Sequence, residues 1–227
     1  MENENISLFP KCAVIVLIAL LFGLIANSLC FAQSYFLVYS GINSPSAVLP
    51  NESSGFLNFN WDKGINLGVS IYFKITNNIY FSPNFEYNYY KYDSFNEPLI
   101  TIPEVNLKAA EGEDSHIYRI SLETRYITPK QVKPQLYLLT GFGYVFEDIG
   151  NIRLHWESMF DPDCEFETER KYNGKNYLVH TLGIGLKISV YRKIALNIEA
   201  KYFTNYKDRF QNSLNIGLLY SFNSPRS

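Results

Sequence analysis

The chain has 227 residues, of which 47% are hydrophobic, 16% aromatic and 19% charged, and its formal net charge is −2. This composition excludes a disordered chain, and it lacks the basic character of a nucleic-acid-binding protein, so no nucleic-acid partner is expected. Its mean hydropathy is slightly negative, which argues against a membrane protein built of many helices. Many aromatic residues at middling hydropathy are typical of a membrane β-barrel, because its strands alternate between lipid-facing and lumen-facing side chains.

An apolar run near the start of the chain indicates an export signal. Residues Cys12 to Ala26 form this run, which is short for a spanning helix and suits the core of a signal peptide. The small residues Cys30 and Ala32 favour cleavage after Ala32. We therefore expect a signal peptide over residues 1–32 and one barrel domain over residues 33–227, with a retained N-terminal anchor as the alternative. Cleavage would leave Cys164 alone, so no intramolecular disulfide is expected.

After this run the sequence alternates repeatedly between apolar and polar residues. In the last segment Leu214, Ile216 and Leu218 share one face, and Ser213 and Asn215 share the other. A strand separates these two sets, whereas a helix would scatter them. The facing of the first strand is not determined by its pattern. The eight predicted strands cover residues 35–43, 56–75, 79–94, 115–127, 135–149, 176–190, 194–206 and 212–222.

The connections between these strands alternate in length. Short turns are expected at 76–78, 128–134 and 191–193, and long loops at 44–55, 95–114 and 150–175. Transmembrane barrels with short turns on one side and long loops on the other have this asymmetry. The predicted fold is therefore all-β: an eight-stranded antiparallel up-and-down transmembrane β-barrel. The alternative is a soluble lipocalin-like barrel, but a barrel of this size has no room inside for so many aliphatic side chains.

Charged side chains recur on the polar faces of these strands, which would line the lumen. Because a buried charge must be paired, we expect a salt-bridge network that plugs the lumen, with a narrow conduit for ions or small solutes as the alternative. We expect Glu86 to pair with Arg119, and Glu199 and Lys201 to join them across the lumen. The predicted lumen charge network consists of Glu86, Arg119, Glu123, Arg125, Lys187, Glu199 and Lys201.

A second group of charges lies in the predicted loop 150–175. Oxygen ligands at this density could bind a divalent cation, although the spacing matches no recognised calcium loop, and a solvated acidic loop is the alternative. The acidic cluster consists of Asp161, Asp163, Glu165, Glu167 and Glu169. The histidines His116, His155 and His180 belong to no visible nucleophile–base–acid set and to no metal-binding spacing. We therefore expect neither an enzyme nor a cofactor nor a metal site built on histidine or cysteine.

The closing strand, residues 215–222, alternates apolar residues and ends in an aromatic residue. With the export signal and the eight strands, it resembles the small outer-membrane β-barrel family of OmpA/OmpX type. The resemblance implies that Tyr220 and Phe222 belong to an assembly signal read by the barrel-assembly machinery. It also implies an outer-membrane location with both mature termini in the periplasm, and contacts with membrane lipid and lipopolysaccharide.

The function that follows is a structural or surface-interaction role, although the sequence identifies no surface ligand. The alternatives are the narrow channel and, less favoured by the residues, a lipid-modifying enzyme of the outer membrane.

Overall fold

The computed structural model describes residues 34–45, 64–92, 101–102, 105–129, 133–148, 150–160, 163–170, 176–205 and 210–222. The predicted signal peptide and its cleavage site, and residues 46–63, lie outside these described residues. No helix in the described part of the chain is long and apolar enough to cross a membrane.

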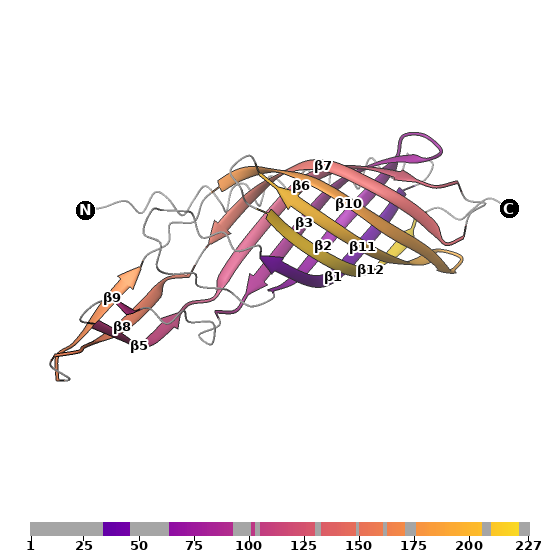
Figure 1. Ribbon diagram of the computed structural model, residues 1–227. Helices are drawn as coiled ribbons and strands as arrows, with labels where there is room; N and C mark the ends of the chain where they lie inside the picture. Colours follow the sequence, from indigo (N-terminus) through magenta and orange to yellow (C-terminus); the bar gives the residue numbers. More distant parts are fainter. Residues whose placement is uncertain are drawn as a thin grey trace, which may run out of the picture.

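Eight long strands close into one antiparallel barrel (Figure 1). Each barrel strand pairs with the barrel strands that come before and after it in the sequence. The first and last strands, β1 and β12, pair to close the barrel, from Tyr35 opposite Ser221 to Pro45 opposite Gln211. The predicted eight-stranded up-and-down barrel is thus confirmed. Its strands are β1 (Ser34–Pro45), β2 (Gly64–Lys74), β3 (Ile79–Tyr90), β6 (Ser115–Ile127), β7 (Gln135–Asp148), β10 (Asn176–Tyr191), β11 (Ile194–Thr204) and β12 (Phe210–Ser221).

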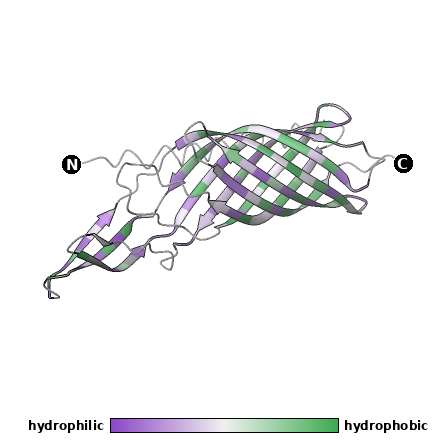
Figure 2. Ribbon diagram, viewed as in Figure 1, coloured by the Kyte–Doolittle hydropathy of each residue, from purple (hydrophilic) through white to green (hydrophobic). Residues whose placement is uncertain are grey.

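The alternation of the sequence determines which side chains face inward. On β12 the side chains of Leu214, Ile216 and Leu218 are 53–60% exposed on the outer surface, whereas Ser213 and Asn215 are buried inside. The same two-residue period appears on the other barrel strands as alternating hydrophobic and hydrophilic bands (Figure 2). The barrel therefore has an apolar outside, and its buried polar and charged side chains lie inside.

An inner cluster of aromatic and aliphatic side chains fills the barrel at the end where the short turns lie. Two glycines make room for its tyrosines. A Cβ atom on Gly68 would lie 2.1 Å from the ring of Tyr39, and one on Gly185 would lie 2.1 Å from the ring of Tyr137. The cluster consists of Tyr35, Leu37, Tyr39, Tyr72, Tyr80, Ile127, Tyr137, Leu139, Ala195 and Leu219.

A second, four-stranded sheet extends from the opposite end of the barrel (Figure 1). Its order is β4 (Thr101–Ile102), β5 (Val105–Gly112), β8 (Ile152–Ser158) and β9 (Glu165–Arg170). The prediction that these segments are loops is wrong. On β8, Ile152, Leu154 and Trp156 alternate with polar residues and are buried, so the strand pattern is present but short and interrupted by charge.

Candidate functional site

Six charged side chains meet inside the barrel, and each is at most 3% exposed. Three are acidic and three are basic, so their formal charges cancel. They project from β3, β6 and β11: Glu86, Arg119, Glu123, Arg125, Glu199 and Lys201. Lys187, the seventh residue of the predicted network, lies apart from them near the short-turn end, with its ammonium 4.1 Å from the centre of the Tyr35 ring.

Four of these side chains form a closed ring, which we call the charge ring: Glu123, Arg125, Glu199 and Lys201. Arg125 donates to Glu123 and to Glu199 through its two terminal nitrogens. The Lys201 ammonium lies 2.9 Å from the Glu123 carboxylate and 3.0 Å from the Glu199 carboxylate. Each carboxylate therefore contacts both cations. Because β6 and β11 are not neighbours in the barrel, the Arg125–Glu199 and Lys201–Glu123 contacts cross the lumen.

The remaining two charges form a separate ion pair. Arg119 Nη1 lies 2.6 Å from Glu86 Oε1, on residues that are register partners in neighbouring strands. Arg119 also donates to Gln211, and its guanidinium lies 3.4 Å from the centre of the Phe203 ring. This is the pair that the sequence predicts. The prediction that Glu199 and Lys201 join this pair is wrong, because those two side chains contact Arg125 and Glu123 instead.

Tyrosines that the sequence did not single out connect these charges. Tyr39 donates to Glu86 at 2.9 Å, and its ring centre lies 5.2 Å from the Lys201 ammonium, between the ion pair and the charge ring. Tyr137 donates to Glu199 at 2.7 Å. The Arg125 guanidinium lies 4.4 Å from the centre of the Tyr72 ring. Tyr72 could have been found from the sequence, since it shares a strand face with Ser70 and Lys74.

A double-mutant cycle tests the Glu86–Arg119 pair. Glu86→Ala and Arg119→Ala should each lower the free energy of unfolding by about 3–5 kcal/mol, because each leaves a buried charge without its partner. The double variant should cost less than the sum of the two. Urea unfolding in lipid vesicles measures all three. The exposed pair Lys108–Glu165 supplies a matched cycle that should show little coupling, and additive costs at Glu86 and Arg119 would contradict burial of the pair.

The predicted acidic cluster is not a loop. Asp161 lies outside the described residues, Asp163 precedes β9, and Glu165, Glu167 and Glu169 lie on β9 itself. Glu165 accepts a hydrogen bond from Lys108 on β5, which lowers the pKa of its carboxyl. His155 Nδ1 lies 3.1 Å from Glu167. Within the described residues no group of three or more His, Cys, Asp or Glu side chains could hold a metal ion.

The three histidines have different partners. His116 hydrogen-bonds the Tyr87 hydroxyl at 2.7 Å, and His180 hydrogen-bonds the Thr140 hydroxyl at 3.0 Å. His155 lies on the second sheet beside Glu167. Ser115, adjacent to His116 in the chain, is buried on the inner side of β6. Among these contacts of the described residues, no histidine lies between a serine and an acidic side chain, as it would in a catalytic triad.

Tyr220 and Phe222 lie on the outer surface where β12 ends. Their ring centres are 5.7 Å apart, and the Phe222 amide donates to the Ser34 carbonyl at 3.1 Å, next to the seam between β1 and β12. Both side chains are partly exposed to the surroundings of the barrel. This position is accessible to a partner that binds the closing strand.

Replacing Phe222 by aspartate should reduce the amount of folded barrel in membranes. The charge alone costs roughly 0–1 kcal/mol at the membrane boundary. A loss of folded protein greater than this cost explains would indicate that the aromatic side chain is needed for assembly. Immunoblots of unheated membrane fractions measure the folded fraction. Phe160→Asp, at an exposed position just after β8, is the matched control and should leave that fraction unchanged; equal levels for both variants would contradict the assembly role.

The fold and the lumen define a class: a small, closed, eight-stranded antiparallel barrel with an apolar outside and paired charges inside. No family model matches the chain, and no curated protein matches it. Among solved structures, the chain is similar to Ail, the attachment invasion locus protein of Yersinia pestis, with 15% identity and a TM-score of 0.46 over 85% of this chain and 99% of that chain.

Two further barrels are similar in the same way. Neisserial surface protein A has 13% identity and a TM-score of 0.46, over 82% of this chain and 96% of that chain. The N-terminal β-barrel domain of Pseudomonas aeruginosa OprF has 12% identity and a TM-score of 0.41, over 83% of this chain and 97% of that chain. Each of these is a similarity of fold.

Proposed function

We propose that this protein is an outer-membrane β-barrel with a structural or surface-interaction role, whose lumen is closed by its paired charges. One observation carries the proposal: the barrel is apolar outside and charged inside. Large apolar side chains such as Leu138 and Phe142 are at least 60% exposed on the outer surface. A soluble barrel would gain nothing from exposing them, whereas in a bilayer they contact lipid.

The two ends of the barrel differ in a way that supports one orientation. The described ends of the domain, Ser34 and Phe222, lie at the short-turn end, and the second sheet lies at the other. Outer-membrane barrels place short turns in the periplasm and long connections outside. In this orientation both ends of the barrel domain are periplasmic, and the second sheet reaches into the lipopolysaccharide layer or beyond it.

The lumen is better suited to closure than to conduction. An eight-stranded barrel is only wide enough inside for its own side chains. Here the six charges cancel, each contacts a partner of opposite sign, and tyrosines fill the space between them. A plug of this kind holds the barrel rigid and keeps ions from crossing.

The surface role belongs to the second sheet. Its strand β9 carries Glu165, Glu167 and Glu169 on one face, and exposed Met159 and Phe160 follow β8. A contiguous exposed apolar patch with a polar rim marks a surface that binds partners, and Met159 and Phe160 would be the centre of such a patch. We propose that this sheet makes the contacts of the protein with its surroundings.

Gel mobility and conductance test the proposal together. The purified protein should require detergent for solubility, and its mobility on a gel should change after boiling. In planar bilayers it should give no steady conductance, whereas the variant Arg125→Met should conduct. A protein that is soluble without detergent would contradict the membrane assignment, and a steady conductance of the unmodified protein would support the channel instead of the plug.

A further inference from the structure

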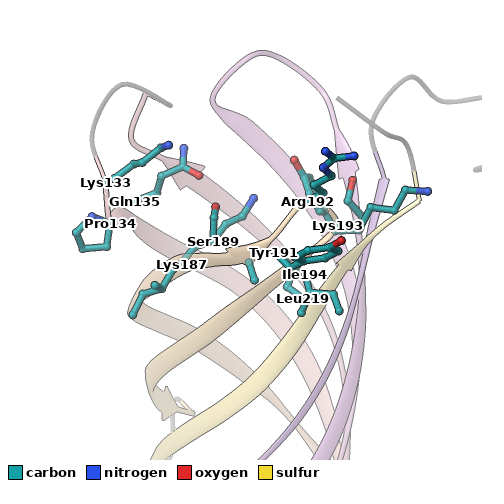
Figure 3. Close-up of a pocket in the computed structure, with 14 residues that line it drawn as sticks. Lys133, Pro134, Gln135, Lys187, Ser189, Tyr191, Arg192, Lys193, Ile194 and Leu219 are labelled. Carbon is teal, nitrogen blue, oxygen red and sulfur yellow. The ribbon is translucent and has the colours of Figure 1, made fainter. Parts of the chain in front are cut away.

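A cavity of about 590 Å³ opens at the short-turn end of the barrel, at the mouth of the lumen. Its floor includes Tyr35, Ala195 and Leu219, which belong to the inner cluster. Figure 3 shows Lys133 and Gln135 on one side of this mouth and Arg192 and Lys193 on the other. The volume falls within the range of about 300–1,000 Å³ that is usual for small-molecule sites.

Four basic side chains line this cavity, and we call it the basic mouth: Lys133, Lys187, Arg192 and Lys193. Among the described residues that line it there is no aspartate or glutamate. Deeper in the barrel, by comparison, Arg119, Arg125 and Lys201 lie among the carboxylates of Glu86, Glu123 and Glu199. Four like charges around one concave space favour an anion there, because low-dielectric walls concentrate their field.

The outer surface beside the basic mouth indicates where the anion comes from. Val190 and Leu136, next to it in the chain, are exposed apolar side chains of β10 and β7, and the exposed Tyr191 and Ile194 lie at its rim, where they also line the cavity. The apolar belt therefore reaches the lip of the cavity. In a bilayer, the level just beyond the apolar belt is the level of the lipid phosphates.

We propose that the basic mouth binds the phosphate group of an anionic phospholipid from the leaflet that surrounds the short-turn end. The inference rests on the proposed membrane assignment. Arginine and lysine are the side chains that bind phosphate best, arginine through paired hydrogen bonds and lysine as a point charge. The acyl chains of such a lipid would lie along Val190 and Ile194, while its headgroup enters between Lys187 and Arg192.

Lipid selection tests this site. The protein is inserted into nanodiscs of mixed phosphatidylglycerol and phosphatidylcholine, and native mass spectrometry measures which lipid it retains. The unmodified protein should retain phosphatidylglycerol preferentially. Lys187→Gln combined with Arg192→Gln should lower this preference roughly 30-fold, the effect expected of two basic side chains near an anionic surface. Lys187→Arg should preserve it.

A matched control removes the same charge elsewhere. Lys108→Gln combined with Arg153→Gln, both on the second sheet, should leave the preference unchanged. Competition with inorganic phosphate and with glycerol phosphate separates a lipid site from a site for small anions. Displacement of the retained lipid by millimolar phosphate would overturn the lipid assignment.

The gel shift on boiling is recorded for every sample, so that failure of the lipid site can be distinguished from failure of the membrane assignment. Insertion with a normal shift but no preference for phosphatidylglycerol would overturn the basic mouth as a binding site and leave the barrel assignment standing. A protein that does not insert at all would overturn the membrane assignment and this inference with it.

Discussion

Replacing Arg125 by methionine should lower the free energy of unfolding by about 3–5 kcal/mol, the usual cost of breaking a buried ion pair by removing one partner. Arg125 is fully buried and contacts both carboxylates of the charge ring, so its loss leaves Glu123 and Glu199 with Lys201 as their only cation in the ring. Methionine retains much of the apolar stem of arginine but lacks the guanidinium, which lies 4.4 Å from the centre of the Tyr72 ring. Urea unfolding in lipid vesicles measures the difference.

The control for this variant is Arg153→Met on the second sheet, where the arginine is exposed. An exposed charge contributes little to stability, so the free energy of unfolding of Arg153→Met should be close to that of the unmodified protein. If Arg125→Met costs no more than Arg153→Met, water reaches the charge ring and the lumen is not closed by it. Conductance in planar bilayers then decides whether ions pass.

The second large effect is expected on the outer surface. Ile216→Arg places a charge in the middle of β12, on the side that faces lipid, and should lower the free energy of unfolding in vesicles by about 2–4 kcal/mol. Met159→Arg, at an equally exposed apolar position just after β8, is the control and should have little effect. If the barrel were soluble, Ile216→Arg would leave the free energy of unfolding almost unchanged, since an arginine on a surface in water costs almost nothing.

Most of the barrel could be predicted from the sequence because its strands are long and two-sided. Over ten or more residues a two-residue period is unambiguous, and the polar face of β3 or β12 can only be the inside of a lipid-facing barrel. The sequence of the first strand did not indicate which side faces the lumen, because both of its faces carry apolar or aromatic residues. Tyr35, Leu37 and Tyr39 point inward, and Val38 and Ile42 point outward.

The second sheet could not be distinguished from loops for a different reason. β9 has six residues and mostly charged side chains, and β4 has only two residues. The sheet also depends on residues that are far apart in the chain, since β5 pairs with β8 and places Leu107 opposite Trp156. A short stretch in which charged residues alternate with others is also typical of a solvated loop.

The pairing inside the lumen was predictable only between neighbouring strands. Glu86 and Arg119 are opposite each other in the register of β3 and β6, so their contact follows from the strand pattern. The contacts of Arg125 and Glu123 with Glu199 and Lys201 cross the lumen. Which residues meet there depends on strand tilt and stagger, which the sequence of one strand does not specify.

Spin labelling tests the central claim, that the outer face of this barrel contacts lipid. In a Cys164→Ser background, a nitroxide is attached at Leu214→Cys, Ile216→Cys or Leu218→Cys, and its collision rates with oxygen and with a water-soluble nickel complex are measured in vesicles. The native Cys164, which is exposed, is labelled in the otherwise unmodified protein as the aqueous reference. We predict that oxygen dominates at all three β12 positions and the nickel complex dominates at Cys164. Nickel accessibility along residues 214–218 equal to that at Cys164 would contradict a membrane-spanning barrel.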